Sequence, residues 1–145
     1  MLSSTIIELL KTRLGDEIGN YEIPPPVFED MQGEFVDFSA DENYIITRFP
    51  VFERYCNPYG TMQGGMIAAA IDNTLGPLSM LVAPPNVTRR LQITYNRAIK
   101  PELGQIVIEA QFDGAKGKQL KFSARVRDPD GNLLARAVAT HWIVS

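Results

Sequence analysis

An amide side chain, a glycine pair and a carboxylate lie in one short stretch of the sequence, from Asn57 through Gly64-Gly65 to Asp72. Two glycines at the start of a helix leave its first backbone N–H groups accessible, and such groups can polarise a carbonyl and hold a developing oxyanion. A carboxylate can activate water or attack directly. The residue types therefore predict chemistry at a carbonyl group.

Asp72 is the one charged residue in a segment that otherwise has the pattern of a buried helix. From Gly65 to Val82 the sequence has no Lys, Arg or Glu, and a helix that is apolar on nearly every side is typically buried. An ionised carboxylate is costly there unless something binds it, so we favour a functional role for Asp72. The alternative is a buried polar residue satisfied by Thr88 or by backbone donors. Pro77 removes a helical hydrogen bond, which predicts a kink or an end of the helix.

The spacing between the glycine pair and the carboxylate predicts a dimer. Gly65 and Asp72 are seven residues apart, which returns to nearly the same helix face but roughly 10 Å further along the axis, at ~1.5 Å per residue. The two groups are then too far apart to act on one carbonyl. In an isologous dimer with antiparallel helices, the Gly65 end of one copy can lie beside Asp72 of the other.

The rest of the chain predicts one sheet around this helix. The expected elements are a short helix capped by Ser3 or Ser4 and stopped by Gly15, an extended link at 24–26, strands over 35–39 and 44–49, the apolar helix, and strands over 91–95, 106–112, 120–126 and 133–143. Strands joined by hairpins form an antiparallel sheet, and its apolar face can cover a long helix. We therefore expect an α+β fold, with an antiparallel sheet wrapped around one central helix. Residues 1–145 should form a single domain, with 1–26 as its N-terminal helix and proline-rich link.

Composition excludes several classes of protein. The net charge of -3 provides no global attraction for nucleic acid. One cysteine, Cys56, and one histidine, His141, exclude an intrachain disulfide, a cysteine metal site and a histidine cage. No apolar run is expected to reach transmembrane length, and charged residues within the first fourteen argue against a secretory signal. We expect a cytoplasmic protein with no membrane partner, no metal and no cofactor.

The motif and several downstream segments together resemble the hot-dog thioesterases of the phenylacetate-degradation (PaaI-like) type. That family has Asn, five residues, His-Gly-Gly, then Asp nine residues after the His. The matching residues here are Asn57, Gln63-Gly64-Gly65 and Asp72, followed by Gln92–Arg97, the turn Lys100–Gly104, the hairpin at Gly117-Lys118 and the Asp-Gly turn before the last strand. The resemblance covers the chain from about Phe35 to the C-terminus. It implies a hot-dog fold.

The resemblance also implies an activity, the hydrolysis of acyl-coenzyme A thioesters at dimer interfaces. Asp72 matches the general base or nucleophile, and Gly65 matches the amide that polarises the thioester carbonyl. Asn57 matches the residue that places the thioester or the water, and Thr88 matches a Ser or Thr beside the carboxylate. Coenzyme A belongs to the substrate, so no separate cofactor is implied. Gln63 replaces the family histidine and cannot titrate or carry charge.

Other residues are candidates for substrate binding, each with a simpler alternative. Gln63 and Gly64 flank the helix start, although Gly64-Gly65 could instead serve tight packing and Asn57-Pro58 an ordinary turn. Arg89, Arg90 and Lys118 could hold the phosphates of coenzyme A, or be solvated surface charge. Arg89 and Arg90 would point to opposite faces of a regular strand, so at most one is expected to face the site.

Two further functions stay open as alternatives. One is a non-catalytic acyl-coenzyme A-binding domain, which the loss of the family histidine at Gln63 would suit. The other is a hydratase or dehydratase, which needs a catalytic histidine. His141 is far in sequence from Asp72 and is interpreted as a satisfied strand residue, and Cys56 as a packing residue because no histidine lies near it. The sequence does not separate a dimer from a tetramer.

Overall fold

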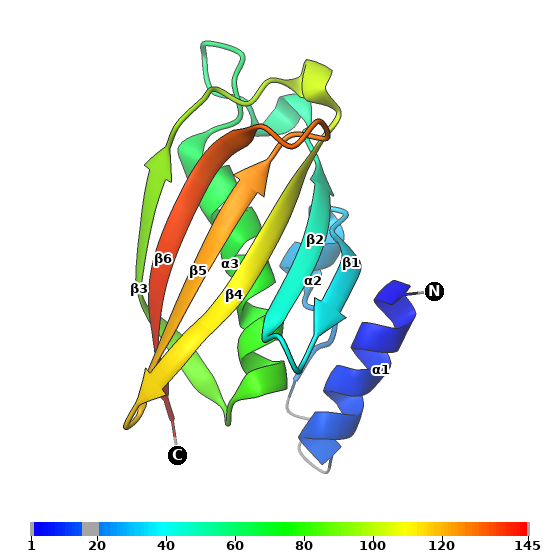
Figure 1. The fold of residues 1–145 in the computed structure, drawn as a ribbon. Helices are drawn as coiled ribbons and strands as arrows, with labels where there is room; N and C mark the ends of the chain where they lie inside the picture. Colours follow the sequence, from blue (N-terminus) through cyan, green and yellow to red (C-terminus); the bar gives the residue numbers. More distant parts are fainter. Residues whose placement is uncertain (1, 16–20, 145) are drawn as a thin grey trace.

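The chain folds as one sheet around a long helix, in the order expected from the sequence. The computed structural model describes residues 2–15 and 21–144. Its elements are α1 (Leu2–Leu14), α2 (Pro26–Asp30), β1 (Glu34–Ser39), β2 (Tyr44–Pro50), α3 (Gly64–Val82), β3 (Asn86–Tyr95), β4 (Gln105–Lys116), β5 (Gln119–Arg127) and β6 (Leu133–Ile143), with short 3-10 turns at Glu53–Tyr55 and Pro101–Leu103. Figure 1 shows α3 running along the face of the curved sheet. The expected α+β hot-dog architecture is thus confirmed.

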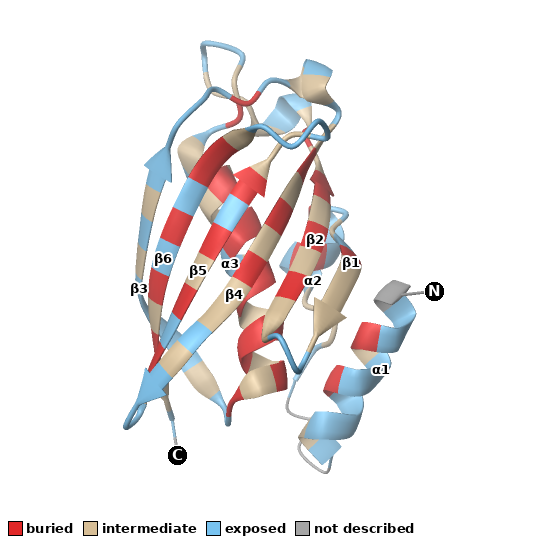
Figure 2. Cartoon of the chain, viewed as in Figure 1, coloured by how far each residue is buried: buried red, intermediate tan, exposed pale blue. Residues whose placement is uncertain are grey.

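The sheet has the strand order β1-β2-β4-β5-β6-β3, and every neighbouring pair is antiparallel. Its inward residues are the apolar ones of the alternating pattern, so buried and accessible positions alternate along the central strands (Figure 2). Ile71, Leu75 and Leu78 of α3 are almost fully buried in the same core. One polar pair lies inside it, where the hydroxyls of Thr47 and Thr74 are 2.7 Å apart.

Helix α3 continues through Pro77. The proline lies inside the helix, which extends to Val82, so of the two predicted outcomes, a kink or an end, the end does not occur. A proline normally disfavours helix at the preceding residue through a clash with that residue's Cβ, and Gly76 has none. By length and composition α3 could also cross a membrane, which corrects the expectation that no segment would. Half of α3 is buried inside the fold, and core helices of folded proteins pass the same test of length and composition.

The N-terminal region differs from the expectation in two places. Helix α1 begins at Leu2, so neither Ser3 nor Ser4 precedes it as a cap. The proline run does not remain extended, because Pro26 opens the short helix α2, where a proline without an N–H is tolerated. Phe28 of α2 is buried and stacks on Phe35 of β1, with ring centroids 4.7 Å apart.

Strand β3 forms one edge of the sheet, and within residues 2–15 and 21–144 it pairs only with β6. Thr88 lies opposite His141, and the register shifts between Thr88 and Arg90. Such a bulge adds one residue to a strand and changes which way the following side chains point. Both the edge and the bulge bear on the site described next.

Candidate active site

Asp72 lies on the uncovered side of α3, in the middle of the helix. The sequence predicted a buried carboxylate, and this was wrong for the single chain, because Asp72 is exposed. Within α3 the only other exposed residue is Gly65. The sheet buries one side of this apolar helix. Small residues such as Ala68 and Ala69 leave the opposite side half-buried. The two residues expected to do chemistry are thus the two that α3 presents outward.

The carboxylate is held by a hydroxyl from the edge strand. Thr88 Oγ1, near the start of β3, donates a hydrogen bond to Asp72 Oδ1 at 3.1 Å. A hydrogen bond to the charged form stabilises that form and fixes its orientation. Thr88 therefore has the position beside the carboxylate that the sequence resemblance implied, and both groups come from one chain.

The chain's one histidine adjoins this pair, an arrangement that the sequence pattern did not indicate. His141 Nε2 lies 3.3 Å from Thr88 Oγ1, and His141 Nδ1 lies 2.8 Å from Asn86 Oδ1. The side chain is only 2% exposed, on the inward face of β6. Thr88 is therefore a bridge between an exposed carboxylate and a buried imidazole.

Burial lowers the pKa of His141 below its ordinary value, and the negative charge of Asp72 opposes part of this shift. Its neighbours explain the direction: β5 presents Leu120 opposite it, and the ring of Phe122 lies 4.7 Å away. An apolar surrounding disfavours the charged imidazolium. His141 is accordingly neutral at neutral pH.

The other half of the candidate site is the start of α3, where the two glycines have different surroundings. The carbonyl of Gly64 accepts a hydrogen bond of 2.8 Å from the Tyr95 hydroxyl, and a Cβ on Gly64 would come within 3.2 Å of the Tyr95 side chain. A Cβ on Gly65 would meet nothing within 4 Å. Gly64 thus serves close packing, and Gly65 leaves open space beside the backbone.

Gln63 precedes the helix and holds its start through the main chain. Its carbonyl accepts hydrogen bonds from the N–H groups of Met66 and Ile67, at 2.9 and 3.1 Å. Its side chain is exposed and makes no capping hydrogen bond. The first N–H groups of a helix have no acceptor within it, so the Gly65 N–H in the first turn of α3 is left without an intrahelical partner.

Asn57 is occupied within its own loop. Its Oδ1 accepts from the N–H groups of Tyr59 and Thr61 at 3.0 and 3.2 Å, and its Nδ2 donates to Thr61 Oγ1 at 2.9 Å. This pattern is an Asx turn that shapes the loop before α3. Within one chain Asn57 therefore contacts its loop and makes no hydrogen bond to Asp72.

An apolar cavity of about 210 Å³ opens next to Asp72. It lies between α3 and the N-terminal region, and its lining includes Leu10, Ile23, Phe35, Pro77 and Met80. A second cavity of about 700 Å³ shares Tyr21 and Met80 with it and continues toward the end of α3. A carboxylate in the lining of an apolar space suits a reacting carbonyl that carries an apolar group.

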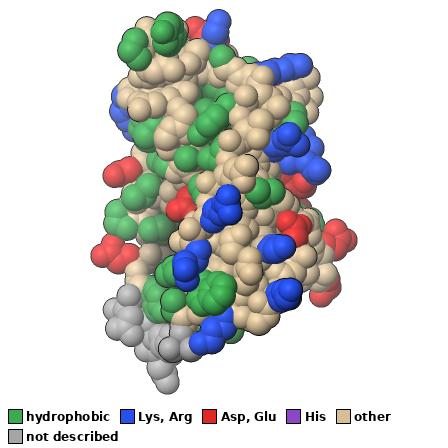
Figure 3. Space-filling view, turned by 90° about the vertical axis from the view of Figure 1, so that its left-hand side faces the viewer, with side chains coloured by type: hydrophobic (Ala, Val, Ile, Leu, Met, Phe, Trp, Pro, Cys, Tyr) green, Lys and Arg blue, Asp and Glu red, His purple; other side chains and the backbone are tan. Residues whose placement is uncertain are grey.

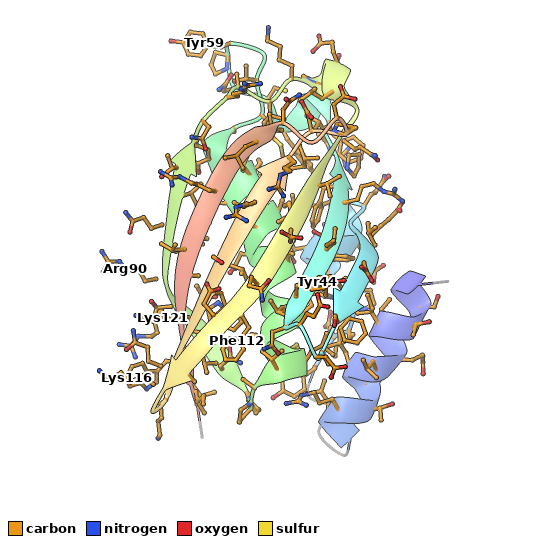
Figure 4. All side chains as sticks on the ribbon, in the orientation of Figure 1. Tyr44, Tyr59, Arg90, Phe112, Lys116 and Lys121 are labelled. Atoms are coloured by element: carbon orange, nitrogen blue, oxygen red, sulfur yellow. The ribbon has the colours of Figure 1, made fainter. Side chains whose placement is uncertain are left out.

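The basic candidates lie on the outer side of the sheet. Arg90 and Lys121 both line a shallow outer cavity, and Figure 4 shows them with Lys116 along one side of the molecule. The guanidinium of Arg89 lies over the ring of Trp142, 5.3 Å from its centroid. Because of the bulge, the expected alternation of Arg89 and Arg90 does not hold.

Figure 3 shows Lys and Arg side chains spread over the face that contains β3, the edge strand of the sheet. Lys118 is exposed in the β4–β5 hairpin, and its carbonyl accepts from the N–H of Ile143 at 2.8 Å. Arg89, Arg90 and Lys118 therefore lie outside the helix-facing side of the sheet. In the described residues, 2–15 and 21–144, no group of His, Cys, Asp and Glu could hold a metal ion.

Sequence reasoning missed Asn86 and Tyr95 and treated His141 as unrelated to Asp72. The single available signal was that His141 is the one histidine of the chain. The pairing of β3 with β6 brings Thr88 opposite His141, and that pairing joins segments more than fifty residues apart. The roles expected of Asp72, Gly65, Asn57 and Thr88 remain predictions.

Comparison with known proteins gives the family. The thioesterase superfamily model matches residues 59–135. Human and orangutan (Pongo abelii) acyl-coenzyme A thioesterase 13 are each 30% identical to the chain over 99 residues, which are 67% of this chain and 69% of theirs.

Solved structures show the same fold. The E. coli PaaI protein from the phenylacetic acid degradation operon aligns with a TM-score of 0.78 at 10% identity, over 100% of this chain and 97% of its own. Zebrafish thioesterase superfamily member 2 aligns with a TM-score of 0.76 at 21% identity, over 99% of each chain. A Streptococcus mutans protein solved with acetyl-coenzyme A has a TM-score of 0.71 at 21% identity, over 78% of this chain and 89% of its own.

The family match includes Gly65, Asp72 and Thr88, the residues whose positions on the open side of α3 and on β3 were described above. The chain therefore belongs to the thioesterase superfamily, and it is a thioester hydrolase with a hot-dog fold.

Proposed function

We propose that the chain hydrolyses an acyl-coenzyme A thioester to the free acid and coenzyme A, at a site that two copies of the chain form together. The observation that carries the proposal is the exposed carboxylate of Asp72, held by Thr88 and lining an apolar cavity. The names of the curated relatives support acyl-coenzyme A as the substrate class.

Two features of the single chain support a twofold site. Gly65 and Asp72 are the exposed residues of α3, but their separation of roughly 10 Å along the helix, at ~1.5 Å per residue, is too large for one carbonyl. The edge strand β3 has unpaired backbone groups that can pair with another strand. If two β3 edges meet around a twofold axis, two α3 helices lie antiparallel and Gly65 of one copy approaches Asp72 of the other.

The proposed reaction uses one water and no added reactant. Asp72 takes a proton from water, and the water oxygen bonds to the thioester carbon. The Gly65 N–H of the partner copy donates to the carbonyl oxygen as its negative charge develops. When the C–S bond breaks, the proton on Asp72 passes to the sulfur, which yields the acid and the thiol. Direct attack by Asp72 would instead form an anhydride, and only this route places oxygen-18 from labelled water in Asp72 in a single turnover.

The cavity beside Asp72 would take the acyl group. Its volume of about 210 Å³ equals that of about seven water molecules at about 30 Å³ each, so a medium-length chain or a single ring would fill it. The adjoining cavity that shares Tyr21 and Met80 would receive a longer chain. The coenzyme A phosphates would contact cations of the β3 side, for which Arg89, Arg90 and Lys118 are the candidates.

The activity is tested with a panel of short, long and aromatic acyl-coenzyme A thioesters. We expect turnover that falls when the acyl group outgrows the two cavities. Micromolar binding with no turnover of any thioester in the panel would contradict hydrolysis of acyl-coenzyme A and support the non-catalytic alternative, for which Gln63 in place of the family histidine is the specific observation.

The shared site is tested by mixing two inactive variants. Asp72→Asn and Gly65→Val each leave both sites of a homodimer defective, but a mixed dimer has one site with both groups intact and one with neither. After unfolding and refolding together, the equimolar mixture should regain about a quarter of wild-type activity, because half of the dimers are mixed and each has one working site. If activity stays at the level of the separate variants, the site lies within one chain.

A further inference from the structure

We propose that His141 is a positioning residue for Asp72. Asn86 holds the ring of His141, and the ring provides a buried acceptor for the proton of the Thr88 hydroxyl. The Thr88 oxygen can then accept a hydrogen bond from Asp72 when Asp72 carries a proton. This inference rests on the proposed role of Asp72 as the base in hydrolysis. It concerns a residue that the family motif does not include and that does not contact the open side of α3.

The hydrogen bonds of Asn86 fix the orientation of its side chain. Its Nδ2 lies 2.8 Å from the carbonyl oxygen of Pro84 and 3.4 Å from that of Ser79. Carbonyl oxygens only accept, so the amide nitrogen must face them and the amide oxygen must face His141. Asn86 is thereby fixed as an acceptor toward the imidazole.

The orientation of Asn86 in turn fixes the tautomer of His141. Asn86 Oδ1, as an acceptor 2.8 Å from Nδ1, requires the proton on Nδ1. In the neutral ring the other nitrogen, Nε2, then has only a lone pair. That lone pair faces Thr88 Oγ1 at 3.3 Å, so the histidine can accept a hydrogen bond from Thr88 and cannot donate one.

Thr88 has one hydroxyl proton and two possible acceptors for it, Asp72 and His141. When Asp72 is ionised, the proton goes to the carboxylate oxygen at 3.1 Å. When Asp72 has taken a proton from water, the carboxylic acid can donate to Thr88 Oγ1, and the hydroxyl can turn to donate to His141 Nε2. All hydrogen bonds then run in one direction, from Asp72 through Thr88, His141 and Asn86 to two backbone carbonyls. No covalent bond changes within the network, and the proton stays on Asp72 until it passes to the sulfur.

Protonation of His141 reverses this preference. With a proton on Nε2 the ring donates to Thr88, and the hydroxyl can donate only to Asp72. In this arrangement the Thr88 oxygen cannot accept from a protonated Asp72 while its own proton has another acceptor, so the one-way chain of hydrogen bonds cannot form. The charged group that acts on His141 is Asp72 from α3, while β5 presents Leu120 and Phe122 and β3 presents Asn86 and Thr88. Activity should therefore fall on the acid side as His141 takes up a proton.

The network is tested first without any substrate. Because His141 is the one histidine of the chain, its imidazole signals can be followed by NMR without ambiguity. We expect nitrogen shifts of a neutral ring protonated at Nδ1, and a pKa that falls further in Asp72→Asn, where the favourable negative charge is lost. A proton on Nε2, or a pKa unchanged in Asp72→Asn, would overturn the proposal and leave the proposed hydrolysis untouched.

The second test is the pH profile of kcat/KM for three variants. His141→Gln can accept from Thr88 and donate to Asn86 but cannot become charged, so it should keep activity within about threefold at pH 8 and lose the acid-side fall due to the histidine. His141→Phe fills the space without an acceptor and should lower kcat at every pH. Thr47→Val removes a buried hydroxyl of the unrelated core pair and should leave the profile unchanged.

A wild-type profile in both His141 variants would overturn the positioning role, even with hydrolysis intact. Equal losses in His141→Gln and His141→Phe at pH 8 would also overturn it, because they would indicate packing alone. If His141→Phe does not fold, the NMR titration and His141→Gln decide the matter. A wild type without turnover would refute the proposed function, whereas the NMR result would still stand.

Discussion

The two halves of the site, at the middle and at the start of α3, are built in different ways. The Asp72 half is a set of side chains from three elements, with Thr88 and Asn86 from β3 and His141 from β6. The Gly65 half presents bare backbone, and its neighbouring side chains are engaged elsewhere: Tyr95 with Gly64, and Asn57 with its own loop. The first half can be tuned by protonation, and the second offers a fixed dipole and free space.

This difference implies different tolerances to mutation. In the Asp72 half, each side chain depends on the next, so removing one leaves a hydrogen-bonding group without its partner. In the Gly65 half, the group that acts is the backbone N–H, so an added atom is the change that does harm. Substitutions that delete groups should therefore damage the first half, and substitutions that add groups should damage the second.

The largest effect is expected for Asp72→Asn, which removes the base and keeps the shape. We expect a fall in kcat of about 10²- to 10⁴-fold, the usual contribution of a general base, with little change in stability because Asp72 is exposed. The measurement is steady-state hydrolysis of the best thioester of the panel. Asp41→Asn, in the exposed turn between β1 and β2, is the matched control and should retain wild-type activity.

The next effect separates the two glycines. In Gly65→Ala the new methyl group meets nothing in the chain, so the helix should gain about 0.5–1 kcal/mol, while activity should fall about 10²-fold because the methyl group occupies the space of the oxyanion. In Gly64→Ala the methyl group presses on Tyr95 at 3.2 Å, so stability should fall.

Urea unfolding and hydrolysis rates measure both glycine variants. A Gly65→Ala protein that is active and stabilised would mean that the open backbone has no part in catalysis. A Gly64→Ala protein that gains stability would mean that Tyr95 moves aside freely.

A smaller effect is expected at Thr88, where deletion and conservation can be compared. Thr88→Val removes the hydroxyl at nearly the same volume and should lower kcat about 10-fold, because it removes the group that orients the carboxylate and accepts from its protonated form, and one hydrogen bond contributes about 0.5–1.5 kcal/mol. Thr88→Ser keeps the hydroxyl and should stay close to the wild type. Equal rates for Thr88→Val and Thr88→Ser would remove the hydroxyl from the mechanism.

The smallest effect is on stability as a function of pH. The folded chain holds the pKa of His141 below its ordinary value of 6.5, so between these two values the unfolded chain binds more protons than the folded one. The neutral histidine therefore contributes stability that is fully present above about pH 6.5 and is lost as the pH falls through the folded pKa. Urea midpoints at a series of pH values should show this loss in the wild type and a flatter dependence in His141→Gln.

Much of the fold was predictable because local patterns determine it. Alternating apolar residues fixed β4, β5 and β6, with the bounds of β6 as expected, and the uncharged run fixed α3. Pro77 does not end α3 because the clash that a proline makes with the preceding Cβ is absent at Gly76. The burial of Asp72 was misjudged because an apolar helix looks the same in sequence whether the sheet covers one side of it or all sides.

The site was predictable in its parts and not in its connections. The sequence by itself determined the residue types and their spacing along one helix, because a helical repeat places Gly65 and Asp72 on the same face. Only the tertiary structure decided which face of α3 stays open, where the bulge turns Arg89 and Arg90, and that His141 adjoins Thr88. Those outcomes depend on the pairing of distant strands, since the register between β3 and β6 is set by packing of the whole sheet on α3 and by no short stretch of sequence.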